Sequence, residues 1–523
     1  MKKIILLVMA VLIIAAPLFA NGSNEKATTP AVTTGVGADG VTKGGRLVIA
    51  VAADAASMSP TVIRSPTNLY YASTCFETLM AFDENGVPQP FLAKSVTEDA
   101  SALTYTIELK QGILFHDGTE LNAEVCKWNI DHYKAEGILS TSFYSKLESV
   151  EVTGPYTVVL HLSSWDSSIP CALARECGYM ISKEAYEKDP KGFSEHPVGT
   201  GSFKFKSWEH GVSMLFEKFD KYWQGEPNLD EIEFVIYKNE VVAQAALISG
   251  EIHVMSPLGF NTTDSLKAQG YNVDIMNVPQ SCYTVCINCV KEGPLSNVKV
   301  RQAMAYAMDG EEIIPVLFGS YAEVTNQYGV PGSLYYDETV DIKHDLDKAK
   351  SLMKEAGYEN GFTTQITVVN SERSIKFCQI IAEQLAKINI NLELKIVDGG
   401  AYMKAIDTWD SGLLLHTMSM YNGINSQLIG NFRQGLSGGA LGSGSFLHPD
   451  DVNDVLNQAA GSLSQDAPAL FKKAQHMIFE DYCMLRALCV TYQAYVSSPK
   501  LHDCGYAENT PYYSNFYKAW LEK

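Results

Sequence analysis

Three cysteines at close spacing are the residues of this 523-residue chain best suited to chemistry. Cys282, Cys286 and Cys289 form the pattern C-x3-C-x2-C, which in radical S-adenosylmethionine enzymes holds an iron–sulfur cluster through three converging thiolates. The segment 282–290, CYTVCINCV, instead has the character of a strand, and strand side chains alternate between faces. Cys282 and Cys286 would then face one way and Cys289 the other, so we predict core cysteines and no cluster.

A serine offers a second kind of chemistry. Ser437 lies in Gly-Leu-Ser-Gly-Gly at residues 435–439, which matches the G-x-S-x-G pattern of hydrolases. Such a nucleophile needs a hydrophobic strand before it and a helix after it. Residues 431–434 are no such strand, and the residues after the motif are rich in Gly and Ser. An exported hydrolase that uses Ser437 is kept as an alternative hypothesis.

Nucleotide and metal sites are not indicated by the sequence. Gly35, Gly37 and Gly40 match the dinucleotide-binding fingerprint, but no strand precedes them. Eleven histidines are scattered along the chain, and none forms a close pair at metal-ligand spacing. We therefore expect no cofactor and no metal.

The clearest local pattern runs from Leu103 to Lys110, where apolar residues at every second position are separated by polar ones. A period of two predicts a strand with one buried face. The residues His116-Asp117-Gly118 then predict a turn. A helix from Ala123 to about Tyr133 follows, with Thr119 or Asn122 as its N-terminal cap.

Strands and helices alternate along the second half of the chain, which favours an α/β fold. Strands are expected at 46–52, 150–152, 157–162, 363–369, 391–397 and 490–496, and helices at 298–308, 346–356, 372–387, 450–459 and 468–482. A chain of this length is too long for one core, so we expect two or three lobes.

Composition argues against several classes of partner. The net charge is −20 and no run of Lys and Arg occurs, whereas binding to nucleic acid or to an anionic membrane surface needs basic residues. The 11 cysteines are an odd number, so at least one thiol must be free or paired between molecules. Acidity of this size mostly keeps a protein soluble.

The N-terminus predicts export. Met1-Lys2-Lys3 precedes an apolar run from Ile4 to Ala16 that Pro17 ends, which is the pattern of a signal peptide cleaved after Ala20. The run is too short to span a membrane comfortably. Residues 21–43 are rich in Ser, Thr, Gly, Ala and Pro and predict a flexible leader. No cysteine stands near the cleavage position, so a lipid anchor is not indicated.

Several segments together resemble one protein family. Residues 93–118, AKSVTEDASALTYTIELKQGILFHDG, resemble the signature of the extracytoplasmic solute-binding proteins of ABC importers, peptide/nickel-binding class (family 5). Val96 stands where Trp is usual and Ala102 where Gly is usual. Residues 196–208, HPVGTGSFKFKSW, and the segment 298–308 resemble later motifs of the family in the same order. The resemblance extends from about residue 46 to the C-terminus.

The resemblance implies a two-lobed periplasmic-binding-protein fold of type II, with an extra subdomain and mixed sheets flanked by helices. The expected division is a signal peptide at 1–20, a leader at 21–43, lobe I at 44–75 and 182–281, the extra subdomain at 76–181, lobe II at 282–495, and a return to lobe I at 496–523. The hinge would lie near residues 280 and 495, where the chain passes between the lobes.

The resemblance also implies a function without catalysis. The expected protein is an exported monomer, in the periplasm or at the outer face of the cytoplasmic membrane. It would capture a small solute (a peptide, an oligosaccharide or another compound) between two hinged lobes and deliver it to the permease subunits of an ABC transporter. A sensory or chaperone-like binding protein without transport is a further alternative beside the Ser437 hydrolase.

Five residues are expected to line the cleft, from their segment positions in the family: Met58, Ser59, Tyr283, Tyr421 and Asn422. His416 is a further candidate to approach the cleft.

One family feature is missing from this chain. In peptide-binding relatives an Asp receives the peptide α-ammonium, but the corresponding stretch here, Ser419 to Ser426, has no carboxylate. Losing one partner of a buried charge pair costs about 2–5 kcal/mol, against about −8 kcal/mol for a whole micromolar complex. We therefore favour a neutral or sugar-like ligand over ordinary peptides, unless Asp407 or Asp410 replaces the missing group.

Overall fold

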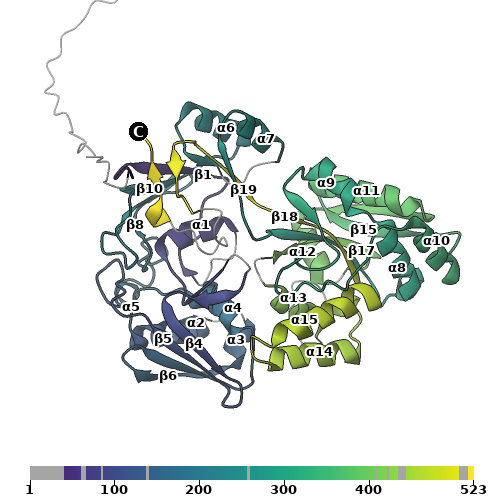
Figure 1. The fold of residues 1–523 in the computed structure, drawn as a ribbon, viewed down its shortest axis with the longest axis horizontal. Helices are drawn as coiled ribbons and strands as arrows, with labels where there is room; N and C mark the ends of the chain where they lie inside the picture. The colour runs from purple at the N-terminus through teal and green to yellow at the C-terminus, as the bar shows by residue number, and fades with distance from the viewer. Residues whose placement is uncertain are drawn as a thin grey trace, which may run out of the picture.

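The computed structural model describes residues 40–60, 66–83, 86–136, 141–255, 260–407, 409–420, 423–433, 443–505 and 516–523. These residues form two lobes that lie side by side, with the N-terminal half of the chain in one and most of the C-terminal half in the other (Figure 1). The predicted mixed sheets flanked by helices are confirmed. Within the described residues, no helix combines the length and the apolar character that crossing a membrane requires.

Lobe I is built on a seven-stranded sheet in the order β12-β19-β11-β1-β10-β9-β8. Its strands are β1 (Arg46–Val51), β8 (Phe203–Glu209), β9 (Ser213–Lys218), β10 (Glu231–Ile236), β11 (Val254–Met255), β12 (Asn272–Ile275) and β19 (Ala494–Ser497). The predicted strand at 46–52 is confirmed as β1, which is parallel to both β10 and β11. Helices α1 (Pro66–Cys75), α6 (Glu240–Ser249) and α7 (Phe260–Ala268) complete the lobe with short pairs β2 (Met80–Phe82) and β3 (Pro88–Pro90), and β20 (Leu501–His502) and β21 (Trp520–Leu521).

The extra subdomain is an antiparallel sheet in the order β4-β5-β7-β6 with four helices. Its elements are β4 (Ala93–Asp99), β5 (Thr104–Leu109), β6 (Leu147–Gly154), β7 (Thr157–Leu162), α2 (Ala123–Glu136), α3 (Thr141–Lys146), α4 (Ile169–Leu173) and α5 (Lys183–Lys188). The predicted alternation holds along β5, where Tyr105, Ile107 and Leu109 are buried. Of the two predicted caps of α2, Asn122 is used, since its Oδ1 accepts the amide N–H of Val125 at 3.0 Å.

The two motifs of lobe I that resemble the family bind each other. The His116 backbone amide donates to the carbonyl of Gly199 at 2.9 Å, and the His116 ring joins the carbonyl of Gly201 through Nε2 at 2.9 Å. A Cβ on Gly199 would stand 2.2 Å from the carbonyl oxygen of Cys75, so only glycine allows this approach. The motifs therefore build a structural joint between the subdomain and the main sheet of lobe I.

Lobe II is built on a six-stranded sheet in the order β14-β18-β13-β17-β15-β16. Its elements are β13 (Ser281–Ile287), α8 (Val298–Ala307), α9 (Gly310–Leu317), β14 (Ala322–Val324), α10 (Leu346–Glu355), β15 (Phe362–Val369), α11 (Glu372–Ala386), β16 (Ile390–Val397), α12 (Gly399–Asp407), β17 (Leu413–Ser419), α13 (Ile424–Phe432), α14 (Asp450–Gly461), α15 (Ala467–His476) and β18 (Leu485–Thr491). The predicted β-α-β unit is confirmed, because β15 and β16 pair in parallel around α11. The side chains of Asn297 and Asp345 cap α8 and α10.

Two predicted elements differ in detail. The helix expected at 468–482 ends as α15 at His476, and a π-helical turn, Met477–Asp481, follows it. The strand expected at 490–496 is two strands, β18 in lobe II and β19 in lobe I. The sequence gives no sign of this break, because the side chains of residues 485–496 are buried almost without interruption, first in the sheet of lobe II and then in that of lobe I.

Candidate functional site

The described chain crosses between the lobes at two places, residues 276–280 and residues 492–493. The crossings run side by side: the amide of Met276 donates to the carbonyl of Gln493 at 2.9 Å, and that of Gln280 donates to Thr491 at 2.7 Å. Two adjacent single-strand connections between lobes are the geometry of a hinge.

Buried polar groups fasten the second crossing to lobe I. The hydroxyl groups of Tyr70 and Tyr495 lie 2.8 Å apart, and the Gln493 amide donates to the Tyr70 hydroxyl. All three side chains are at most 3% exposed. On the other side, the Tyr492 amide donates to the carbonyl of Tyr321 in lobe II at 2.9 Å. At this crossing the chain thus passes from partners in lobe II to partners in lobe I between Tyr492 and Gln493.

The loop after β1 lies at the edge of lobe I nearest the crossings. The carboxyl ends of β1, β10 and β11 meet there, and ligands of open α/β sheets bind at such ends. Met58 is fully buried in the lobe I core, and its amide donates to the carbonyl of Ser194 at 3.1 Å. Ser59 is half-buried, and its amide donates to Ser57 Oγ at 3.0 Å. The Met58 side chain therefore packs within lobe I, and ligand contact at both residues stays a prediction.

On lobe II, the strand ends nearest the crossings come together at Ser281, Ser419 and Thr491. The predicted ligand residues Tyr421 and Asn422 come two and three positions after Ser419 and lie outside the described residues. Their role stays a prediction.

Tyr283 lies on β13 inside the lobe II core. Its side chain is 8% exposed, and its ring centroid is 4.9 Å from that of Phe318 and 5.2 Å from that of Phe377. Burial raises the pKa of its phenol, so Tyr283 is neutral at physiological pH. It packs lobe II against its helices, and ligand contact through this side chain also stays a prediction.

His416 is a buried neutral group. It lies on β17 opposite Thr284, and its Nδ1 is 3.2 Å from the hydroxyl of Tyr402 on α12. Burial lowers the pKa of His416 to about 4. Its position under α12 makes it part of lobe II packing.

The three closely spaced cysteines are core residues, as predicted. Cys282, Cys286 and Cys289 are at most 2% exposed, and burial raises the pKa of each thiol. The 11 cysteines all lie in the described ranges, and all but Cys504 are buried. Across the described residues, no group of three or more His, Cys, Asp and Glu is arranged to hold a metal ion. Ser437 lies outside the described residues.

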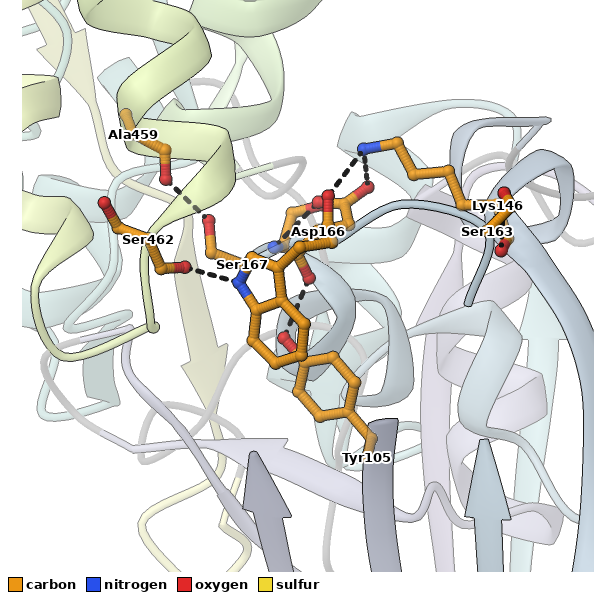
Figure 2. Close-up of polar contacts among 9 residues, drawn as sticks. Tyr105, Lys146, Ser163, Asp166, Ser167, Ala459 and Ser462 are labelled. Atoms are coloured by element: carbon orange, nitrogen blue, oxygen red, sulfur yellow. Dashed lines mark hydrogen bonds and ion pairs between the residues drawn. The ribbon is translucent and has the colours of Figure 1, made fainter. Parts of the chain in front are cut away.

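A second contact joins the lobes through the extra subdomain (Figure 2). The Trp165 indole N–H donates to the carbonyl of Ser462 at 2.6 Å. Ser167 donates through Oγ to the carbonyl of Ala459 at 3.0 Å and through its amide to that of Ala460 at 3.2 Å. In return, Ser464 donates through its amide and its hydroxyl to the Glu98 carboxylate. We call this contact, made by Glu98, Trp165, Ser167 and residues 459–464, the clasp.

The lobe I side of the clasp is held in place by its own partners. The Trp165 ring stacks on Tyr105, with centroids 4.7 Å apart and planes at 6°. The Tyr105 hydroxyl donates to the carbonyl of Asp166 at 2.8 Å, and Lys146 pairs with the Asp166 carboxylate at 2.8 Å. Sequence reasoning missed these residues, because Trp165-Asp166-Ser167 signals only a turn and its partners lie almost 300 positions away.

Two further contacts bridge the lobes. The Tyr321 hydroxyl in lobe II donates to Asp264 on α7 at 2.9 Å. The Asn425 amide on α13 donates to the Cys171 sulfur on α4 at 3.8 Å. The lobes are therefore in contact at these two places as well as at the clasp.

A cavity of about 280 Å³ lies at the other end of lobe II, lined by residues 291–295, 362–365 and 410–412. Strands β13 and β17 run between the two ends: Ile287 pairs with Leu413 at the end near the cavity, and Ser281 pairs with Ser419 at the end near the crossings. The cavity is thus remote from the interface between the lobes. Asp410 lines it and pairs with Lys395 at 2.9 Å, so its position argues against Asp410 as the replacement for the missing carboxylate.

Comparisons with known proteins agree on one family. The model of bacterial extracellular solute-binding proteins, family 5 Middle, matches residues 87–433. The glutathione-binding protein GsiB of Escherichia coli O1:K1 / APEC is 29% identical over 451 residues, which cover 83% of this chain and 87% of that protein.

Solved structures show the same fold. HbpA2 from Haemophilus parasuis superposes with a TM-score of 0.81 at 22% identity, covering 92% of this chain and 100% of that one. The periplasmic binding protein DppA from Helicobacter pylori, in complex with the peptide STSA, superposes with a TM-score of 0.72 at 25% identity, covering 92% and 99%.

Proposed function

The chain belongs to family 5 of the bacterial extracellular solute-binding proteins, and from this premise we propose that it captures a peptide-like solute of the glutathione type between its lobes. Members of this family are the extracytoplasmic binding components of ABC importers. The observation that carries the proposal is the pair of adjacent crossings, which allows lobe II to rotate over lobe I. Closure would exclude water from the solute.

The names of the relatives support glutathione as the solute class, and the sequence restricts how its ammonium group could be bound. Curated relatives at 28–30% identity are named as glutathione-binding proteins. Glutathione carries an α-ammonium, yet residues 419–426 offer no carboxylate to receive it. We propose that affinity comes from the carboxylates, the amides and the thiol of the solute, and that its ammonium is left in a polar but uncharged setting. A neutral or sugar-like solute is the second candidate, favoured by the same missing carboxylate.

Paired ligands test this proposal by isothermal titration calorimetry on residues 21–523. Reduced glutathione is compared with its N-acetylated form, and an oligosaccharide series is titrated in parallel. We expect glutathione to bind and N-acetylation to weaken it less than about threefold, because no charge pair is lost. Removing a buried pair would weaken binding by about 30-fold or more. A loss of that size would show that another carboxylate replaces the missing Asp, and binding of oligosaccharides alone would favour the second candidate.

We further propose that residues 1–20 are removed on export and that the mature protein acts as a monomer beside the permease, without catalysis. Mass spectrometry of the exported protein checks the cleavage, and mass spectrometry of the recovered solute checks the absence of catalysis. A solute recovered in hydrolysed form, and recovered intact from the Ser437→Ala variant, would instead support the hydrolase hypothesis.

A further inference from the structure

We infer that the clasp is a built-in latch that sets the fraction of ligand-free protein with closed lobes. This inference concerns the regulation of the proposed cleft and rests on the proposed function for its biological meaning. The latch itself consists of contacts within the chain, so it is tested without any solute.

The clasp uses groups that cannot be left unpaired without cost. The last carbonyl groups of a helix have no partner within the helix. At the end of α14 the Ala460 carbonyl accepts the Ser167 amide, and the Ala459 carbonyl accepts the Ser167 hydroxyl as well as the amide of Ser462. Ser167 is 5% exposed and Trp165 is 8% exposed. Separation of the lobes would break these bonds and admit water to each group. Closed lobes are thus favoured by the paired backbone groups of α14.

Apolar packing adds to the same contact. Leu463, between the two polar halves of the clasp, packs against the hydrophobic core of lobe I although it belongs to lobe II. Opening would expose this side chain together with the face of Trp165 that does not stack on Tyr105. The stacked indole and the Lys146–Asp166 pair hold the lobe I side in its bonding geometry, which lowers the entropy lost when the clasp forms.

The place of the clasp gives it leverage. The crossings lie where β12 leads to β13 and β18 leads to β19, and the clasp lies where the extra subdomain meets α14, away from the crossings (Figure 1). A rotation about the crossings therefore moves the two halves of the clasp apart more than it moves residues near the hinge.

The clasp can affect affinity through the population of the closed state. If only a fraction f of the ligand-free protein is in the state that binds, the apparent dissociation constant of the ligand equals its intrinsic dissociation constant divided by f. A weaker clasp lowers f if closed lobes complete the site.

Two substitutions remove clasp bonds and leave the rest of the subdomain intact. Glu98→Ala deletes the carboxylate that accepts from Ser464, and Glu108→Ala on the adjacent strand β5 is its control, because Glu108 is exposed and forms an ion pair with Lys94 within the subdomain. Trp165→Phe keeps a ring over Tyr105 and deletes the indole donor. Trp128→Phe on α2 is the control for the loss of an indole elsewhere in the subdomain.

The first measurement is hydrogen exchange in the ligand-free protein. The amides of Ser167 and Ser464 donate across the interface, so they report the clasp directly. We expect both to be protected in the wild type and to exchange at least tenfold faster in Glu98→Ala and Trp165→Phe, with neither control changed. Unprotected amides in the wild type, or equal exchange in variants and controls, would overturn the latch.

The second measurement is ligand affinity, with glutathione as the probe. We expect clasp variants to bind three- to tenfold more weakly at an unchanged thermal midpoint of the ligand-free protein, and controls to bind like the wild type. Equal affinity, despite faster exchange, would show that the clasp does not govern the cleft and would overturn the regulatory role. Failure of glutathione to bind any form would refute the proposed solute, while the exchange result would still decide the latch.

Discussion

Glu77 is a carboxyl group enclosed in lobe I by neutral donors. It accepts hydrogen bonds from Thr200 Oγ1 at 2.8 Å, from the Tyr222 hydroxyl at 2.6 Å and from the Trp223 indole at 3.0 Å. The side chain is 2% exposed, and burial raises its pKa to about 7, although the three donors act in the opposite direction. Its replacement by Gln isolates the effect of the charge, because the amide keeps the shape and one acceptor.

The magnitude follows from proton linkage. The carboxyl titrates near 4.5 in the unfolded chain and near 7 in the folded one, and each pKa unit is worth about 1.4 kcal/mol, so the difference is about 3 kcal/mol. Between these values the unfolded state binds fewer protons than the folded state. The stability due to Glu77 is therefore complete below about pH 4.5 and is lost as pH rises through about 7.

Urea unfolding at pH 4.5, 6 and 8 tests this argument, with circular dichroism as the signal. Between pH 4.5 and pH 8, the free energy of unfolding of Glu77→Gln is expected to rise by about 3 kcal/mol relative to that of the wild type, whatever the difference between the two proteins at pH 4.5. Glu124→Gln, at an exposed position of α2, is the control and should parallel the wild type. A stability difference for Glu77→Gln that does not change with pH would refute the reasoning.

Two further predictions concern the packing of each lobe. Gly199→Ala should destabilise the protein by about 2–3 kcal/mol in urea unfolding, because its Cβ would overlap the Cys75 carbonyl, whereas Gly399→Ala meets no atom within 4 Å and should be tolerated. Acid should act on lobe II through His416, whose pKa is lowered by burial to about 4, so stability is lost as pH falls from about 6.5 to 4. His416→Gln should remove about 3 kcal/mol of that loss, and unchanged acid sensitivity in the variant would contradict this.

Elements with local signals were predictable from the sequence. The cap at Asp345 and the left-handed Gly357 bracket α10, and the apolar spacing of α11 between two strands indicated the β-α-β unit. These signals are local because capping and periodic burial act within a few residues. The family resemblance supplied the two-lobed arrangement, which local signals alone do not contain.

The interface between the lobes was not predictable in the same way. Glu98 and Ser464 are 366 positions apart, so no spacing in the sequence links them. The sequence predicts a ligand role for Tyr283 only from the position of its segment in the family. A strand covered by aromatic rings such as Phe377 has the same composition as a strand that faces a ligand. The same holds for Met58. A methionine buried in the core and a methionine that lines a ligand site both look like an apolar residue after a strand, so the sequence does not separate them.

The position of β19 has a consequence for how the chain folds as it is made. This strand, residues 494–497, inserts between β11 and β12 in the sheet that also holds β1, residues 46–51. A ribosome releases β1 more than 400 residues before β19, so lobe I is unfinished until nearly the whole chain has emerged, with the edges of β11 and β12 open until then. Pairing over this separation gives high contact order and slow folding. The late insertion of β19 thus closes the main sheet of lobe I, and only the short pair of β20 and β21 follows it along the chain.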